Sequence, residues 1–182
     1  MLTTIHTLEG KVALITGSGR GMGRQNAIEL ASRGAYLVIN YSSSAKSTEE
    51  GVKTITDMGR KAIAIQADIS QPSRIVSLFE QATNHYEHID IVVSNSGLGH
   101  SGNVADVTPE EFDRIFTVNT RGQFFVAQQA HKHLSVGGRL ILLSSISAQA
   151  KGVRNHSLYA GSKAAVEAFA RCLATGASQP SS

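Results

Sequence analysis

Five short apolar runs, separated by longer amphipathic segments, most constrain how this chain can fold. The runs are rich in Val, Ile and Leu and nearly continuous, which is typical of strands buried on both faces of a parallel sheet. Between them, apolar residues recur at helical spacing. Alternating strands and helices indicate a doubly wound α/β fold with a parallel sheet and right-handed crossovers. The predicted strands are Val12–Thr16, Tyr36–Asn40, Ala62–Ala67, Ile89–Ser94 and Arg139–Ser145, and the predicted helices are Gly23–Arg33, Thr48–Met58, Pro72–Tyr86, Thr108–Leu134 and Tyr159–Thr175.

Length and composition fit one such domain and exclude several other classes of protein. The 182 residues are 41% hydrophobic, which is enough for one core and excludes wholesale disorder. The single cysteine, Cys172, excludes an intramolecular disulfide framework and a multi-cysteine zinc site, and we predict no metal site. The net charge of +3 comes from scattered basic residues, so we predict no nucleic-acid binding. We predict a single domain over residues 1–174 and a disordered polar tail over residues 175–182.

The apolar segments also bear on location. None approaches the roughly 18 consecutive apolar residues of a membrane helix. The N-terminus lacks the basic start and apolar core of a signal peptide. The sequence therefore predicts no membrane partner and a cytoplasmic, reducing location.

A glycine-rich turn directly follows the first predicted strand. Residues 16–23 fit the pattern T-G-x-x-x-G-x-G, whereas the strict G-x-G-x-x-G pattern fails at Met22. Glycines let the backbone approach a pyrophosphate, and the N-terminus of the following helix offers free N–H groups. An ordinary glycine-rich turn is the alternative, which the strand–turn–helix context disfavours. We predict a Rossmann-type dinucleotide site whose loop residues are Gly17, Arg20, Gly21, Met22 and Gly23.

The end of the second predicted strand indicates which dinucleotide the site prefers. An NAD site usually has an acidic residue there, which accepts from the ribose 2′-hydroxyl. Here Asn40 is followed by Tyr41, Ser42, Ser43 and Ser44. The Arg20 guanidinium can pair with a 2′-phosphate, and the serine hydroxyls add donors, so we predict NADP(H). The alternative is that Arg20 is only a solvated loop arginine.

A serine, a tyrosine and a lysine late in the chain form the most specific pattern. Tyr159 and Lys163 are four residues apart and share one face of the last predicted helix. A free tyrosine, with a pKa of about 10, is a poor acid at neutral pH, and a neighbouring ammonium favours the phenolate. Ser145 ends the fifth predicted strand, at the edge where open α/β sheets bind ligands, and its hydroxyl can donate to a substrate carbonyl. A surface pair on a helix is the alternative for Tyr159 and Lys163, which the rest of the pattern disfavours.

Together these motifs resemble the short-chain dehydrogenase/reductase family over about residues 8–171. Residues 94–97 (Ser-Asn-Ser-Gly) are similar to the family's N-N-A-G element, which contributes Asn95 and Gly97. Asp68 matches the acidic residue at the adenine end of the cofactor, and Asn119 matches a fourth catalytic residue. Within the family, the chain most resembles fungal hydroxynaphthalene and versicolorin reductases. The stretches that carry this resemblance are ITGSGRGMGR, IDIVVSNSG, VTPEEFDRIFTVNTRGQFFVA, GGRLILLSSISAQAKGV and SKAAVEAFARCLA, with fourteen residues from Ser145 to Tyr159.

The resemblance implies a mechanism. NADPH would reduce a ketone, or the keto tautomer of a phenol, from polyketide or terpenoid secondary metabolism. Tyr159 would donate the proton and Ser145 would hold the oxygen that receives it. Lys163 would assist Tyr159, and both would contact the nicotinamide ribose, while Asn119 would anchor a water that refills the proton relay. The implied partners are a small-molecule ketone or alcohol and a second copy of the chain, in a homodimer or homotetramer.

The sequence also departs from the family. Members continue beyond the Tyr–Lys helix into a sixth strand, a Pro-Gly turn, a substrate lid and a seventh strand, which this sequence does not contain. We therefore expect the fifth strand to be an open edge whose Leu140, Ile141, Leu142 and Leu143 face water or another chain. Two interpretations stay open: an NADPH-dependent reductase, and a truncated dinucleotide-binding remnant or partner subunit without catalysis.

Overall fold

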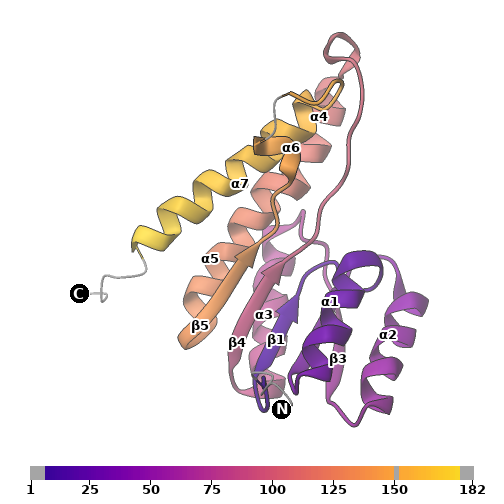
Figure 1. The fold of residues 1–182 in the computed structure, drawn as a ribbon, viewed down its shortest axis with the longest axis vertical. Helices are drawn as coiled ribbons and strands as arrows, with labels where there is room; N and C mark the ends of the chain where they lie inside the picture. Colours follow the sequence, from indigo (N-terminus) through magenta and orange to yellow (C-terminus); the bar gives the residue numbers. More distant parts are fainter. Residues whose placement is uncertain (1–6, 150–151, 177–182) are drawn as a thin grey trace, which may run out of the picture.

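Five parallel strands form one sheet in the computed structural model, which describes residues 7–149 and 152–176. Neighbouring strands are parallel throughout, in the order β3-β2-β1-β4-β5 (Figure 1). The strand order reverses between β1 and β4, which is where open α/β sheets leave a crevice for a ligand. The predicted doubly wound parallel sheet is confirmed. The strands are β1 (Val12–Ile15), β2 (Tyr36–Tyr41), β3 (Ala62–Gln66), β4 (Ile89–Ser94) and β5 (Leu134–Leu142).

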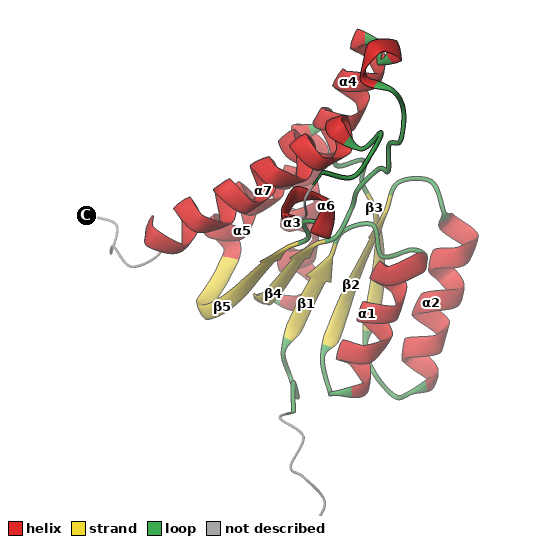
Figure 2. Cartoon of the chain, turned by 45° about the horizontal axis from the view of Figure 1, so that its top comes forward, coloured by secondary structure: helices red, strands yellow, loops and turns green. Residues whose placement is uncertain are grey.

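Helices cover both faces of this sheet (Figure 2). Helices α1 (Gly21–Ser32) and α2 (Ala45–Asp57) bury one apolar cluster, which includes Ile15 and Ile39. Helices α3 (Pro72–Tyr86) and α5 (Gln123–His133) bury a second cluster, which includes Leu14, Phe79 and Val126. Full burial of each such side chain contributes about 1.5–3 kcal/mol to the free energy of unfolding, so the two clusters fix the sheet that positions the loops at its carboxyl end.

The segment predicted as one helix over 108–134 is divided in the structure. A 3₁₀ turn, η1 (Val104–Asp106), precedes α4 (Pro109–Phe116), whose N-terminus is closed by a reciprocal capping box between Thr108 and Glu111. A π-helical segment, η2 (Thr117–Gly122), then separates α4 from α5. Single π-helical turns inside α-helices are often found at functional sites.

Strand β5 begins and ends earlier than predicted. Leu134 already pairs with Ile89, and after an irregularity Arg139 pairs with Ile91, so the helix before it stops at His133. The strand ends at Leu142, and the prediction that Ser145 ends it is wrong. The carbonyl of Leu143 accepts side-chain hydrogen bonds from Gln123 and Lys163, so the chain turns from the sheet into α6 (Ile146–Gln149).

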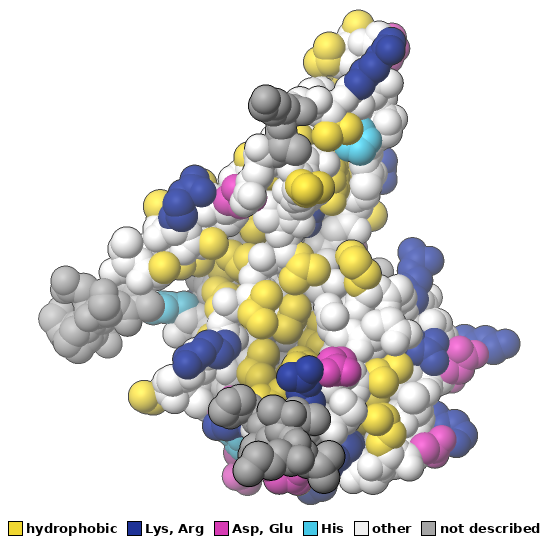
Figure 3. Space-filling view, in the orientation of Figure 1, with side chains coloured by type: hydrophobic (Ala, Val, Ile, Leu, Met, Phe, Trp, Pro, Cys, Tyr) yellow, Lys and Arg dark blue, Asp and Glu magenta, His cyan; other side chains and the backbone are white. Residues whose placement is uncertain are grey.

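The apolar end of β5 is less exposed than predicted. Ile141 is 47% exposed, but Leu140 packs against the α3/α5 cluster and Leu143 against the α1/α2 cluster. The expectation that all four residues from 140 to 143 face water or another chain is therefore wrong for Leu140 and Leu143, which pack against these clusters, and Leu142 is partly buried. Hydrophobic side chains still gather at the centre of the face shown in Figure 3.

Helix α7 (Ser157–Gly176) packs against α4, η2 and α5. It extends two residues past the predicted domain end at residue 174, and the rest of the predicted tail, residues 177–182, lies outside the described residues. No helix in the described part of the chain is both long and apolar enough to span a membrane.

Candidate functional site

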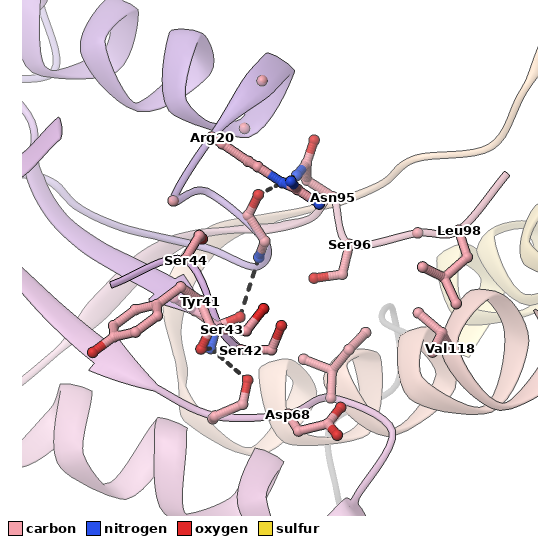
Figure 4. Close-up of a pocket in the computed structure, with 18 of the residues that line it drawn as sticks. Arg20, Tyr41, Ser42, Ser43, Ser44, Asp68, Asn95, Ser96, Leu98 and Val118 are labelled. Carbon is pink, nitrogen blue, oxygen red and sulfur yellow. Dashed lines mark hydrogen bonds between the residues drawn. The ribbon is translucent and has the colours of Figure 1, made fainter. Parts of the chain in front are cut away.

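A pocket of about 360 Å³ lies at the carboxyl ends of β1 to β4 (Figure 4). Twelve residues predicted to bind the cofactor line it, from the glycine loop, the end of β2 and the loops after β3 and β4. Arg20 and Asn95 lie on one side of the pocket and Asp68 on the other. The twelve are Gly17, Arg20, Gly21, Met22, Gly23, Tyr41, Ser42, Ser43, Ser44, Asp68, Asn95 and Gly97; the pocket is also lined by Gly19, Asn40, Ala67, Ile69, Ser96, Leu98 and Val118, which the sequence analysis missed.

Glycine is required at two points of the loop. Gly17 has φ +62°, and a Cβ there would stand 2.7 Å from the Ser96 Oγ. A Cβ on Gly23 would stand 2.7 Å from the Gly17 carbonyl oxygen, so helix α1 can begin directly against the loop only without a side chain. The glycine spacing therefore allows a tight backbone turn that packs directly against Ser96 and the start of α1.

Asn40 holds the loop to the sheet. Its Oδ1 accepts from the Gly17 N–H at 3.1 Å, and its Nδ2 donates to the Ala67 carbonyl at 3.0 Å. The side chain is buried, so these bonds form out of water. A polar residue near the end of an apolar strand is the signal by which the sequence could have identified it.

Asn95 and Thr16 lock the loop after β4 to the glycine loop. The Asn95 Nδ2 donates to the Thr16 carbonyl at 2.9 Å. In return the Thr16 Oγ1 accepts from the backbone N–H groups of Asn95 and Ser96, at 3.0 and 3.1 Å. Two walls of the pocket are thus fixed relative to each other before any ligand binds.

The N-terminus of α1 opens onto the pocket without a competing anion. Its N-cap residue, Arg20, makes no side-chain capping hydrogen bond, and no acidic residue lies in the first turn. The first-turn N–H groups and the helix dipole therefore favour an anion here. Arg20 is exposed at the pocket edge, and Met22, 73% exposed, lies beside it.

Lys163 is buried, which is uncommon for a lysine. It is 3% exposed, and its Nζ donates to the Leu143 carbonyl at 2.9 Å. Burial lowers the pKa of Lys163 from its usual value, because the charged form loses hydration. A Cβ on Gly97 would stand 3.2 Å from this Nζ, so Lys163 lies directly behind the wall of the pocket.

Asn119 connects the same wall to helix α7. Its Oδ1 accepts from the Leu98 N–H at 2.7 Å, and its Nδ2 donates to the Leu98 carbonyl at 2.8 Å and to the Ser162 Oγ at 3.1 Å. Asn119 is fully buried in η2. The π-helical turn therefore directs an amide into the space between the β4 loop and α7.

Tyr159, Lys163 and Ser145 do not line the pocket. The Tyr159 carbonyl accepts from the Ser162 Oγ at 2.7 Å, which ties the backbone of Tyr159 to the partner of Asn119. Tyr159 is half-buried, and its ring faces that of His156 edge-on at 6.2 Å. The Ser145 Oγ accepts from the Ser147 N–H at 3.2 Å. Among the described residues, no hydrogen bond joins the side chain of Tyr159 to Ser145 or Lys163. Within the same part of the chain, no group of three His, Cys, Asp or Glu side chains could hold a metal ion.

Comparison with proteins of known sequence finds relatives that are named as reductases. A trihydroxynaphthalene reductase from Pestalotiopsis fici is 58% identical over 168 residues, which cover 92% of this chain and 60% of that protein. Versicolorin reductase 1 from Dothistroma septosporum is 54% identical over 170 residues, which cover 93% of this chain and 65% of that protein. The chain thus spans less than two thirds of these relatives' length. The predicted resemblance to fungal hydroxynaphthalene and versicolorin reductases is confirmed.

Solved structures agree with this result. A short chain dehydrogenase from Burkholderia cenocepacia, in complex with NADP, matches with a TM-score of 0.90 and 37% identity, over 93% of this chain and 69% of that chain. A blue fluorescent protein from a metagenomic library, in complex with NADPH, matches with a TM-score of 0.89 and 34% identity, over 93% and 70% of the two chains. The family model described as short chain dehydrogenase matches residues 11–180, and the chain belongs to that family.

Proposed function

We propose that the chain is an NADPH-dependent oxidoreductase that reduces a ketone, or the keto tautomer of a phenol, in polyketide or terpenoid secondary metabolism. One observation carries the proposal: the wall of the pocket at Gly97 lies against Lys163, on the helix that also bears Tyr159. The names of the fungal relatives and the two NADP-type complexes support it.

The residues present fit this cofactor. The glycine loop and the uncapped N-terminus of α1 would hold the pyrophosphate. Arg20 and Ser42, Ser43 and Ser44 would meet a 2′-phosphate, since no acidic residue follows β2 to repel it. Asp68 would lie at the adenine end, and Asn95 and Gly97 would line the nicotinamide side, where Tyr159 and Lys163 would contact the ribose. When bound, NADPH supplies the hydride.

The protein's own residues would manage the proton. The Tyr159 hydroxyl would donate its proton to the carbonyl oxygen that is being reduced, and the Ser145 hydroxyl would donate a hydrogen bond to the same oxygen. The buried Lys163 ammonium would stabilise the phenolate that remains. Three protein hydrogen bonds hold the Asn119 amide, and the second lone pair of its Oδ1 would serve the water of the proton relay.

A second candidate is a dinucleotide-binding chain without turnover, acting as a remnant or as a partner subunit. The observation in its favour is the edge position of β5, where Ile141 is exposed. Such a chain would bind NADPH in the same pocket, so cofactor binding alone does not separate it from a reductase. Turnover does.

The experiment is a fluorescence titration of the purified 182-residue chain with NADPH, with NADH as the control, followed by turnover of trihydroxynaphthalene. Saturable binding that prefers NADPH, with consumption of NADPH upon addition of the substrate, supports the reductase. Preferential binding without turnover of trihydroxynaphthalene or simple ketones supports the second candidate. A folded chain that binds neither dinucleotide contradicts both.

The proposal includes a homodimer or homotetramer and a cytoplasmic location. Phe124 on α5 is 43% exposed and meets Phe169 of α7 edge-on at 5.2 Å, which leaves an apolar surface across two neighbouring helices. Cys172 is an exposed free thiol, which suits a reducing compartment. Light scattering of the purified chain tests the first point, and imaging of a tagged chain tests the second.

A further inference from the structure

The segment that carries Ser145 leaves the sheet after Leu143, whose N–H still donates to the Ser94 carbonyl of β4 at 3.2 Å, and side chains of α5 and α7 hold it from there on. We call residues 143–149, which run from the end of β5 through α6, the Ser145 segment. At its start, the Leu143 carbonyl accepts from the Lys163 Nζ at 2.9 Å and from the Gln123 Nε2 at 3.2 Å. The position of Ser145, which lies beyond the end of β5, therefore depends on side chains of α5 and α7.

Glu167 fixes the rest of this segment. Its Oε1 accepts from the Ser144 Oγ at 3.0 Å and from the Gln149 Nε2 at 2.9 Å. The Ser144 Oγ also lies 3.1 Å from the Lys163 carbonyl oxygen. One carboxylate oxygen thus holds residues on both sides of Ser145, and hydrogen bonds to an ionised acceptor are stronger than neutral ones.

The spacing along α7 gives this contact a consequence. Tyr159, Lys163 and Glu167 follow one another at intervals of four residues, so they lie along one face of the helix. Resting on the function proposed above, we propose that Glu167 is a positioning residue, which fixes Ser145 relative to Tyr159 and Lys163. Glu167 does not line the dinucleotide pocket. Misplacement of a reacting group by about 1 Å can cost about 100-fold in rate.

Two substitutions separate positioning from simple support of the helix. Glu167→Gln keeps an Oε1 that can accept both hydrogen bonds, whereas Glu167→Ala removes it. We expect Glu167→Ala to lower kcat by about 10- to 100-fold, with the Kd for NADPH unchanged. Glu167→Gln should restore most of the rate. Glu80→Ala, which removes an exposed carboxylate from α3, is the matched control and should leave kcat unchanged.

Hydrogen exchange provides a readout that does not need turnover. The Ser147 N–H donates to the Ser145 Oγ, so its exchange reports order in the Ser145 segment. In Glu167→Ala we expect the peptide covering this segment to exchange about tenfold faster, while the glycine-loop peptide exchanges as in the wild type. Gln149→Ala, which deletes one donor without changing α7, should show a smaller effect in the same peptide.

The outcomes separate this proposal from the proposed function. If the wild type shows no turnover, the reductase proposal fails, and the exchange of the Ser145 segment still decides the role of Glu167. Wild-type exchange in both Glu167→Ala and Gln149→Ala overturns the positioning role. A Glu167→Gln variant as slow as Glu167→Ala, with the same melting temperature as the wild type, also overturns it. If Glu167→Ala fails to fold, the rate of Glu167→Gln and the exchange of the Ser145 segment in Gln149→Ala decide whether Glu167 positions Ser145.

Discussion

Gly97 and Lys163 lie against each other: a Cβ built on Gly97 would stand 3.2 Å from the Lys163 Nζ and 3.4 Å from the Asn119 Oδ1. Gly97 also lines the dinucleotide pocket. The proposed cofactor site and the proposed proton-transfer group therefore meet at a residue without a side chain. Any larger residue at this position must displace one of them.

The first prediction concerns that meeting point. Gly97→Val should reduce kcat/KM by about 100-fold or more and weaken NADPH binding, because its methyl groups enter the space next to Lys163. Gly97→Ala should have a smaller effect, since its one methyl needs only a small shift of the lysine side chain. Fluorescence titration and initial rates measure both. Gly99→Val is the matched control, because a Cβ on Gly99 meets nothing within 4 Å. Equal behaviour of the two valine variants would contradict the prediction.

Arg20 should select between the two dinucleotides. Arg20→Asp places a carboxylate at the edge of the pocket, where a 2′-phosphate is proposed to bind. We expect the Kd for NADPH to rise about 10- to 100-fold, with a much smaller change for NADH, because only NADPH carries the added charge. Competitive titration measures both constants. Arg74→Asp, on the exposed side of α3, makes the same charge change away from the pocket. Equal losses for both dinucleotides would show that Arg20 does not read the 2′-phosphate.

The sequence predicted those elements that depend on local pattern. The bounds of β4 and α3 are those predicted, because a continuous buried run and a helix that begins at Pro72 are local signals. The long helix after Thr108 was predicted without its interruption. That interruption depends on Asn119, which bonds Leu98 from 21 residues away, and on Gly122, which packs against the Ile69 carbonyl. Such contacts leave no periodic signal.

The candidate site likewise contains residues that a local sequence pattern predicts and residues that only the folded chain brings together. The glycine loop was predicted because its spacing within a strand–turn–helix unit is a local pattern, and its predicted residues line the pocket. Asn40 and Glu167 were missed, since their hydrogen-bond partners lie far away in the sequence: Ala67 for Asn40 and Ser144 for Glu167. The end of β5 was misplaced because Lys163 and Gln123 take the Leu143 carbonyl. These bonds require the folded chain.

Tyr159→Phe should abolish turnover and spare cofactor binding. The substitution removes one hydroxyl, and the ring can keep its edge-on contact with His156. If Tyr159 is the proton donor, kcat should fall by at least about 100-fold, while the Kd for NADPH changes by less than about threefold. Tyr36→Phe serves as the control, because Tyr36 stacks on Tyr86 at the start of β2, at the opposite end of that strand from the pocket. Retained turnover in Tyr159→Phe would refute the assignment.

Asp90 should make the free energy of unfolding depend on pH. Asp90 is buried in β4, and it accepts from the Val12 N–H at 2.9 Å and from the Lys11 Nζ at 3.0 Å. Burial alone would raise the pKa of Asp90, but the Val12 N–H and the Lys11 ammonium outweigh it and hold that pKa below its usual value. A carboxyl whose pKa is lower in the folded state stabilises the fold above its unfolded pKa, and this contribution is lost as pH falls through the folded pKa.

Asp90→Asn tests this dependence, since the amide cannot ionise. At pH 7 we expect the variant to be about 1–3 kcal/mol less stable than the wild type, because the Lys11 ammonium loses its anionic partner. The difference should begin to shrink below about pH 4, where Asp90 of the unfolded wild type takes up a proton while the folded form stays ionised. Urea unfolding at pH 7, 5 and 3.5 measures this difference in stability.

Asp57→Asn is the control. It removes the exposed partner of Lys53 on α2 and should lower the free energy of unfolding by no more than about 0.5 kcal/mol at pH 7. A difference between wild type and Asp90→Asn that stays constant down to pH 3.5 would contradict the lowered pKa, because a carboxyl with the same pKa in the folded and unfolded states does not make the free energy of unfolding depend on pH.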